Sequence, residues 1–202
     1  MKRIGRIRCG KALWFTSLWL LLLLAVLGAN SIVYAGDESH SWKRDVEMRV
    51  GYGVNFANTK TNIQYWAIFP GMRWRFYQKH YDNGAFLNLS AIGEAALLQF
   101  FKPEGAVGLG LTPWLRLDVE YKSLIYYFQA GSGGIWTNLD VHELGQEFNF
   151  TPQGEIGLEY AFSDKLHFNL AARYFHMSNA GLNENNQGVN EVMGLAGISL
   201  PF

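Results

Sequence analysis

The fold is decided by residues 166–202, which read LHFNLAARYFHMSNAGLNENNQGVNEVMGLAGISLPF. Apolar and polar side chains alternate in residues 166–178, a polar segment rich in asparagine and glycine follows, and the alternation resumes in residues 190–202. A period of two residues predicts a β-strand whose two faces meet different environments. We therefore predict a pair of antiparallel strands joined by the loop 179–189.

The same alternation recurs about eight times along the chain. We expect strands at residues 46–56, 63–77, 85–101, 105–119, 124–132, 148–162, 166–178 and 190–202. Such faces suit a soluble sandwich or a membrane barrel with one lipid face and one lumen face. The segment lengths, the charges of both signs on the polar faces and the many aromatic residues on the apolar faces favour the barrel. We predict an all-β fold, an eight-stranded antiparallel transmembrane β-barrel that forms one domain over residues 36–202.

Three features inside the strands lead to further expectations. The charged residues of the polar faces are expected to pair within the lumen, because buried charges need partners. These residues are Glu47, Glu94, Asp118, Glu155, Glu159, Arg49, Arg73, Arg75, Arg116 and Arg173. Pro70 and Pro113 predict bulges or kinks, since proline lacks an N–H and a closed barrel has no free edge. The glycines between positions 131 and 145 predict a mobile loop over residues 132–145.

The two ends of the chain indicate export. Residues 1–35 combine a basic start, an uncharged run and the small-x-small-like ending Val33-Tyr34-Ala35, which is typical of a cleaved signal peptide. An uncleaved anchor is the alternative, because a helix of about 20 residues can cross a bilayer. The alternation that ends at Phe202 resembles the carboxy-terminal insertion signal of bacterial outer-membrane barrels.

Removal of the leader changes the charge of the chain. Seventeen Lys and Arg less the five in residues 1–35 leave 12 against 17 Asp and Glu, a net charge of −5. No basic surface of the kind that binds nucleic acid is expected. The single cysteine, Cys9, lies in the leader, so we expect no disulfide framework.

A histidine and a serine close the strand 166–178 on its apolar face. His176 and Ser178 have the parity of Leu170 and Tyr174, so they are expected to point toward lipid near one membrane boundary. Residues two apart on a strand lie about 6.8 Å apart at Cα and project to the same side. An imidazole beside a hydroxyl is the base and nucleophile pair of ester hydrolysis. A boundary histidine beside a loop serine is the structural alternative, which the spacing leaves open.

A third group must orient the imidazole. Counting back from Phe202, which is taken to face outward, Asn190 falls on the same face as His176 and Glu191 falls on the lumen side. Asn190 is therefore the expected third member, whereas Glu191 would need a bulge to reach the histidine.

The loop that follows the serine is rich in residues that form turns, including Asn179, Gly181 and Asn186. The same loop could stabilise an oxyanion or bind substrate, through the backbone N–H after the serine or through the Asn186 amide.

The run His176-Met177-Ser178-Asn179-Ala180-Gly181-Leu182, with Asn186, Gly188 and a polar residue at 190, resembles the signature of the PagL lipid A 3-O-deacylase family. The resemblance implies an eight-stranded outer-membrane barrel whose outward-facing Ser, His, Glu triad removes the 3-O-linked acyl chain of lipopolysaccharide. It implies Ser178 as nucleophile, His176 as general base and Asn186 as an oxyanion contributor. Position 190 departs from the family, because asparagine replaces the glutamate and would leave the imidazolium less stabilised.

We therefore expect a membrane-embedded serine esterase of the bacterial outer membrane that acts on lipid A. The sequence contains no motif for a metal, nucleotide or flavin, so no cofactor is expected. A non-catalytic small barrel and a hydrolase of another membrane lipid, such as a phospholipase, are the alternatives. The oligomeric state is left open, with a homodimer as one option.

Overall fold

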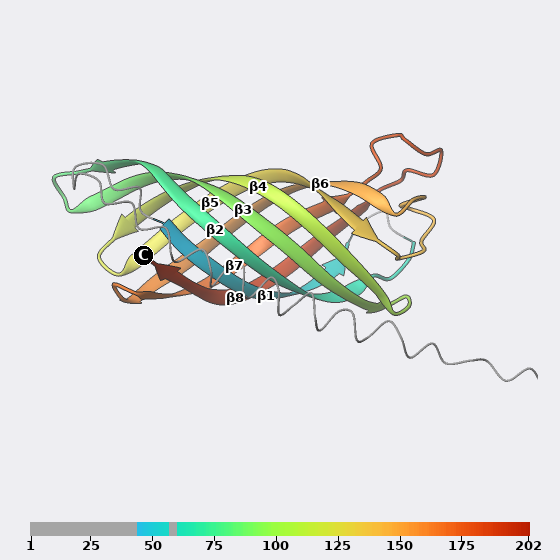
Figure 1. Ribbon diagram of the computed structural model, residues 1–202, viewed down its shortest axis with the longest axis horizontal. Helices are drawn as coiled ribbons and strands as arrows, with labels where there is room; N and C mark the ends of the chain where they lie inside the picture. The colour runs from blue at the N-terminus through green and yellow to red at the C-terminus, as the bar shows by residue number, and fades with distance from the viewer. Residues whose placement is uncertain (1–43, 57–59) are drawn as a thin grey trace, which may run out of the picture. The chain divides into compact units, whose positions relative to one another are not determined.

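The computed structural model describes residues 44–56 and 60–202, so the leader predicted at residues 1–35 lies outside the described part. Within these residues eight antiparallel strands form a closed barrel in sequence order (Figure 1). The strands are β1 (Arg44–Asn55), β2 (Gln64–His80), β3 (Ala85–Lys102), β4 (Ala106–Tyr121), β5 (Leu124–Thr137), β6 (Phe148–Ser163), β7 (Leu166–Met177) and β8 (Val189–Pro201). None of the described residues belongs to a helix long and apolar enough to cross a membrane. The predicted fold class is confirmed.

Alternating burial explains why these segments form a barrel. In β4 the side chain of Leu115 is 68% exposed, whereas that of the next residue, Arg116, is 1% exposed. The barrel closes where β1 pairs with β8, from Asp45 opposite Pro201 to Asn55 opposite Glu191. Closure gives every strand two partners, which is what the lipid environment demands of backbone N–H and C=O groups.

The predicted glycine-rich loop is wrong in its first part, because residues 132–137 continue β5. The cause is a close approach of β5 to β4. A Cβ placed on Gly131 would lie 2.5 Å from the carbonyl oxygen of Pro113, and one on Gly133 would overlap the carbonyl oxygen of Leu111. These glycines therefore serve strand contact and not loop mobility.

Pro70 and Pro113 were expected to cause bulges or kinks, but neither proline shifts the strand register. Pro70 pairs with Met48 in an unbroken β1–β2 register, and the β4–β5 register is the same on both sides of Pro113. The irregularities of β2 lie elsewhere, at Gln64/Tyr65 and Arg75/Tyr77. The missing proline N–H groups thus interrupt the ladder locally without forming a bulge.

Ion pairs fill the middle of the lumen, as predicted. Arg49 and Arg173 each contact both Glu94 and Glu155, with Arg173 Nη1 2.8 Å from Glu94 Oε1 and Arg173 Nε 2.6 Å from Glu155 Oε2. All four side chains are buried. Shared carboxylates of this kind meet the requirement that a buried charge has a partner.

A second group of ion pairs centres on Glu159. Its Oε1 lies 3.0 Å from Arg73 Nη1 and 2.7 Å from Arg116 Nη1. Asp45 pairs with Arg73 and Asp118 with Arg116, and Glu47 Oε1 lies 3.3 Å from Arg73 Nε and 3.8 Å from Arg116 Nη1. Arg75 was expected in this network but forms no ion pair with the described residues, because it lies near the end of the barrel and is only partly buried.

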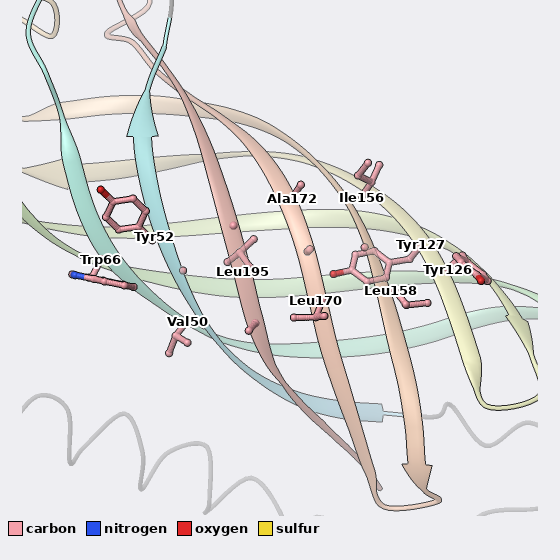
Figure 2. A pocket seen from close by; sticks show the side chains of 15 residues that line it. Val50, Tyr52, Trp66, Tyr126, Tyr127, Ile156, Leu158, Leu170, Ala172 and Leu195 are labelled. Atoms are coloured by element: carbon pink, nitrogen blue, oxygen red, sulfur yellow. The ribbon is translucent and has the colours of Figure 1, made fainter.

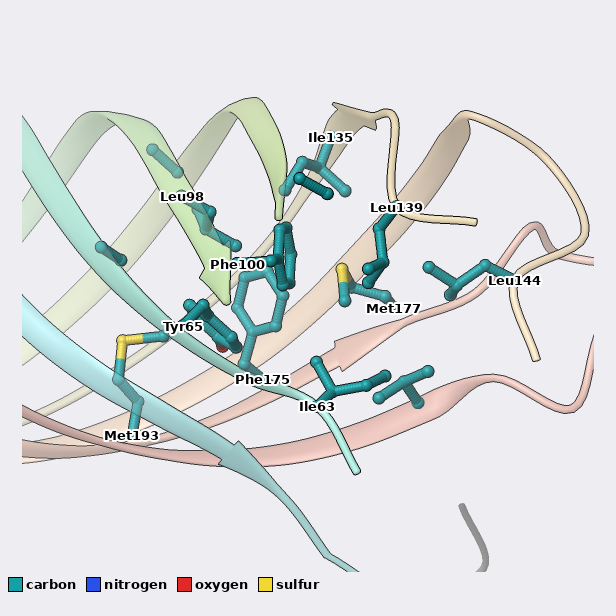
Figure 3. Close-up of a cluster of buried hydrophobic side chains, with 14 of the residues drawn as sticks. Ile63, Tyr65, Leu98, Phe100, Ile135, Leu139, Leu144, Phe175, Met177 and Met193 are labelled. Carbon is teal, nitrogen blue, oxygen red and sulfur yellow. The ribbon is translucent and has the colours of Figure 1, made fainter. Parts of the chain in front are cut away.

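An apolar cluster, which the sequence did not predict, closes the lumen toward the loop between β7 and β8 (Figure 3). Phe175, Met177, Met193 and Leu195 point inward and are buried. They pack with residues of four other strands and of the 138–147 loop, among them Tyr65, Phe69, Leu98, Phe100, Ile135, Leu139 and Leu144. The lumen therefore has a charged layer and an apolar layer.

The two ends of the barrel differ in the lengths of their connections. The connections 81–84, 122–123 and 164–165 are short, and Pro201 lies at the same end, whereas the other end carries the short connection 103–105 and the long loops 138–147 and 178–188. Outer-membrane barrels have short periplasmic turns and longer extracellular loops. The end of β7 and the start of β8 lie at the end with the longer loops, which in outer-membrane barrels is the extracellular end.

Candidate functional site

The last residues of β7 present the predicted nucleophile and base on the outer wall. Phe175 and Met177 point inward and are 1% and 0% exposed. Because side chains of a strand alternate between its faces, Tyr174, His176 and Ser178 point outward, and the last two are partly buried. An imidazole and a hydroxyl therefore share the outer wall of the barrel at the end with the longer loops.

Asn190 faces His176 across the β7–β8 pair. The two residues are register partners, and His176 Nδ1 lies 2.8 Å from Asn190 Oδ1. The same oxygen accepts a hydrogen bond of 2.6 Å from the Tyr174 hydroxyl, and the backbone carbonyl of Asn190 accepts one of 2.9 Å from the N–H of Phe56. Two contacts from β7 thus hold the carboxamide beside the imidazole, and the third holds the backbone of Asn190.

Glu191, the less favoured third member, lies inside the barrel. Its side chain is 0% exposed and accepts a hydrogen bond of 2.9 Å from the Tyr65 hydroxyl. The β7–β8 register continues without a shift through His176 and Asn190, so the bulge that Glu191 would need is absent from this pair of strands.

Ser178 is held in place through its backbone. It forms an isolated bridge with Phe150 of β6, with Phe150 N–H donating to Ser178 O at 2.7 Å and Ser178 N–H donating to Phe150 O at 3.1 Å. The ring of Phe150 contacts that of Phe148 edge-on, with centroids 5.4 Å apart, and both rings are partly exposed. The serine therefore sits at an aromatic rim typical of a membrane interface.

Asn179 organises the loop that follows the serine. It is fully buried, and its Nδ2 donates to the carbonyls of Leu144 and Asn185 at 2.9 and 2.8 Å while its Oδ1 accepts from Gly181 N–H at 2.9 Å. Its own N–H donates to Asn186 Oδ1 at 2.9 Å. The backbone N–H after Ser178, expected as an oxyanion donor, is therefore engaged within the loop, as is the N–H of Gly181.

Asn186 is left as the oxyanion candidate among the three predicted loop residues. Its carboxamide oxygen accepts from the Asn179 N–H, which orients the group, and its Nδ2 forms no hydrogen bond with the residues that the structure describes. A side-chain amide N–H is one of the donor types found in oxyanion holes.

Gly188 packs directly against the imidazole of His176. Its φ is +69°, and a Cβ at this position would lie 2.8 Å from His176 Cε1 and 3.2 Å from His176 Nε2. Only glycine meets both demands, because other residues rarely adopt this φ and none lacks a Cβ. Gly188 N–H also donates to Glu143 O at 3.0 Å, which ties this part of the loop to the 138–147 loop.

Glu143 joins three loops at the outer end. Its carboxylate accepts hydrogen bonds from Lys60 N–H at 3.2 Å and from Thr61 N–H and Oγ1 at 3.1 and 3.0 Å, and its carbonyl accepts from Gly188. Burial alone would raise the pKa of Glu143, but the backbone and hydroxyl donors outweigh burial and lower its pKa below the ordinary value. Its ionised carboxylate therefore holds residues 60 and 61, while its backbone carbonyl holds the loop that carries Gly188.

An apolar groove lies on the outer wall, lined by residues of β1, β2, β5, β6, β7 and β8 (Figure 2). Its floor is formed by small residues, among them Ala172, Gly194 and Ala196, and its rims by large ones such as Trp66 and Ile156. Ala172 and Gly194 are each four residues along their strands from His176 and Asn190, about 13 Å at strand rise. The groove and the polar residues thus lie on one face of the β7–β8 pair.

Sequence reasoning missed three contributors to this site. The Tyr174 hydroxyl, the contact of Gly188 with the imidazole and the hydrogen bonds of Glu143 all depend on contacts across strands or loops, although the even parity of Tyr174 was a usable signal. Among the described residues there is no group of three or more His, Cys, Asp or Glu side chains that could hold a metal ion.

Comparisons with known proteins agree with this architecture. The sequence profile of the family described as "Lipid A 3-O-deacylase (PagL)" matches residues 47–199. The crystal structure of the outer membrane enzyme PagL is similar with a TM-score of 0.54 and 19% identity, over 78% of this chain and 99% of that chain. Neisserial surface protein A (NspA) is similar with a TM-score of 0.59 and 12% identity, over 79% of this chain and 97% of that chain. A search of curated protein sequences finds no match.

Proposed function

Because the chain belongs to the lipid A 3-O-deacylase (PagL) family, we propose that Ser178, His176 and Asn190 carry out its ester hydrolysis. The family assigns the chain to the bacterial outer membrane and to removal of the 3-O-linked acyl chain of lipid A. The proposal adds the side chains that perform the reaction and the part each one takes in it.

The hydrogen bond of 2.8 Å between His176 Nδ1 and Asn190 Oδ1 carries the proposal. A carboxamide oxygen can only accept, so Nδ1 carries the proton and Nε2 keeps its lone pair. That lone pair is what a general base needs in order to take the proton of a serine hydroxyl. An asparagine also orients the histidine of papain-like cysteine proteases, so the amide is chemically sufficient.

The reaction then proceeds in two steps. Ser178 Oγ attacks the ester carbonyl while its proton passes to His176 Nε2, and the resulting imidazolium returns the proton to the departing sugar oxygen. Water, deprotonated by the same nitrogen, next attacks the acyl-serine, releases the fatty acid and restores the hydroxyl. Asn186 Nδ2 is proposed to donate to the oxyanion formed in each step.

The location of the site supports a lipid substrate. The three side chains face the outer wall at the end with the longer loops, and the apolar groove is lined by residues of the same two strands about 13 Å away, at Ala172 and Gly194. We propose that an acyl chain of the substrate lies along this groove, where Gly194 and Ala172 leave room for it. Lipopolysaccharide occupies the leaflet at the extracellular end, so the ester can reach Ser178 without leaving the membrane.

Mass spectrometry of lipid A from cells that express the wild type or Ser178→Ala tests the proposal. The wild type is expected to remove one ester-linked acyl chain and the variant to remove none, with both proteins shown to be folded in the outer membrane. Identical acyl patterns would contradict the assigned nucleophile. Asn190→Glu is expected to raise turnover, because a carboxylate stabilises the imidazolium better than an amide does, and Asn190→Ala is expected to lower it.

A hydrolase of another membrane lipid is the second candidate to be tested, because the groove is lined mainly by apolar and aromatic side chains, which suit the acyl chain of any lipid. Purified protein in detergent should therefore be assayed against lipopolysaccharide and phospholipid side by side. Faster release of fatty acid from phospholipid would favour this candidate. Activity of the Ser178→Ala variant equal to wild type on both lipids would favour a non-catalytic role for Ser178.

A further inference from the structure

We infer that Tyr174 is a positioning residue, whose hydroxyl holds the Asn190 carboxamide with its oxygen, and not its nitrogen, toward His176. The inference rests on the proposed roles of His176 and Asn190 and adds a residue that selects between two orientations of the amide. The observation behind it is that one oxygen, Asn190 Oδ1, accepts from both Tyr174 and His176.

The orientation matters because the two ends of a carboxamide have opposite effects on a histidine. The oxygen requires a proton on Nδ1 and leaves Nε2 free to act as a base, whereas the NH2 group donates to Nδ1 and forces the proton onto Nε2. In a serine protease an asparagine in place of the triad aspartate leaves the geometry intact, yet the wrong tautomer lowers kcat by about 10⁴-fold. An asparagine at position 190 therefore needs a device that fixes its orientation, whereas a carboxylate would not.

The geometry around Tyr174 provides that device. The distance of 2.6 Å between Tyr174 Oη and Asn190 Oδ1 fits an O–H···O bond, which spans about 2.5–3.0 Å, and is shorter than the range of about 2.7–3.2 Å for N–H···O. Exchange of the amide oxygen and nitrogen would place an NH2 group at this short distance. The tyrosine ring is itself fixed edge-on against Phe56, with centroids 6.2 Å apart.

The position of Tyr174 on the barrel explains why its hydroxyl can reach the amide. Tyr174 faces Val192 in the register, so Asn190 is its diagonal neighbour on the same outward face, within reach of a long aromatic side chain. Tyr174 is 45% exposed, and tyrosine is enriched at membrane–water interfaces. Its hydroxyl thus adds a specific hydrogen bond to an ordinary interfacial position.

The test is a double-mutant cycle on kcat for lipid A deacylation. Tyr174→Phe keeps the ring and its contact with Phe56 but removes the hydroxyl, and it is expected to lower kcat about tenfold with KM changed less than twofold. In the Asn190→Asp background the same change is expected to cost less than twofold, because both carboxylate oxygens accept. Tyr160→Phe, on the outward face of β6, is the matched control and should retain wild-type kcat.

A spectroscopic measurement separates the positioning role from a structural one. Nitrogen NMR of protein labelled with ¹⁵N-histidine, with the His176 signals assigned by comparison with His176→Gln, reports which ring nitrogen carries the proton. The wild type should show Nδ1 protonated, and Tyr174→Phe should show a mixture of both tautomers. An unchanged tautomer in Tyr174→Phe, or an equal loss of kcat in the wild-type and Asn190→Asp backgrounds of the cycle, would overturn the inference.

The same measurement distinguishes this inference from the proposed function. The tautomer of His176 can be read in Ser178→Ala, which has no assigned nucleophile. If Ser178→Ala is still active, the proposed function fails, while the shift caused by Tyr174→Phe still supports the positioning role. If Ser178→Ala is inactive and the tautomer does not respond to Tyr174→Phe, the proposed function stands and the positioning role fails.

Discussion

Gly188→Ala should displace the imidazole of His176 without unfolding the barrel. A methyl group at this position would lie 2.8 Å from His176 Cε1, whereas ordinary contact begins at 3.4 Å, so the ring and the loop must separate by 3.4 − 2.8 = 0.6 Å. Because a misplacement of about 1 Å in a catalytic group can cost roughly 100-fold, we expect kcat/KM to fall about 10- to 100-fold. The positive φ of +69° adds a backbone cost of about 1–2 kcal/mol for alanine.

The matched control for this change is Gly84→Ala. Gly84 has a φ of +82° and lies in the turn 81–84 at the opposite end of the barrel, and a Cβ there would meet nothing within 4 Å. It carries the same backbone cost without any contact with the site, so its deacylase activity should equal that of the wild type. Both variants are compared by urea unfolding in lipid vesicles and by release of fatty acid from lipopolysaccharide. Wild-type kcat/KM in a folded Gly188→Ala protein, or equal losses in the two variants, would refute the reasoning.

Three further predictions concern the loops, the lumen and the groove. The pKa of Glu143 is lowered in the folded protein, so the stability that its carboxylate contributes is fully present above its unfolded pKa of about 4.3 and is lost as the pH falls through its folded pKa. Limited proteolysis should therefore cut the outer loops faster in acid. The Glu143→Gln variant should be cut fast already at pH 7. Arg173→Met leaves Glu94 and Glu155 buried with one cation fewer and should lower the free energy of unfolding by about 3–5 kcal/mol in urea titrations; a smaller change would mean that Arg49 compensates. Gly194→Phe fills the groove floor and should lower kcat/KM roughly tenfold for long-chain lipid A but leave a short soluble ester unaffected, and equal losses on both would argue against an acyl chain in the groove.

The strands could be predicted because lipid imposes a period of two on every segment. Leu115 beside Arg116 shows the signal in its clearest form, with one side chain in hydrocarbon and the next in the charged lumen. The signal fails at the outer end, where Phe175 and Met177 are apolar although they face inward. Apolar residues on both faces give no alternation, so the apolar layer of the lumen could not be predicted from the pattern.

The site could be predicted in part because its members lie close together in sequence. Parity placed His176 and Asn190 on the outward face, and the structure brings them into contact as register partners. The Glu143 carboxylate could not be connected to the site from sequence, because its partners Lys60 and Thr61 lie 83 and 82 residues away along the chain. Contacts of that range follow from closure of the barrel and leave no local pattern.

The charged and apolar layers of the lumen determine how substrate and products can reach and leave the protein. Guanidinium–carboxylate pairs around Arg49 and Arg173 block the axis, and the rings of Phe100 and Phe175 block it again nearer the surface of the cell. The lumen is thus filled by side chains and is not an open channel, so a lipid substrate would reach the outer wall, and its products would leave it, within the plane of the membrane. Released fatty acid and trimmed glycolipid would both remain in the plane of the bilayer, so lateral diffusion, and not export through a pore, governs what happens to them next.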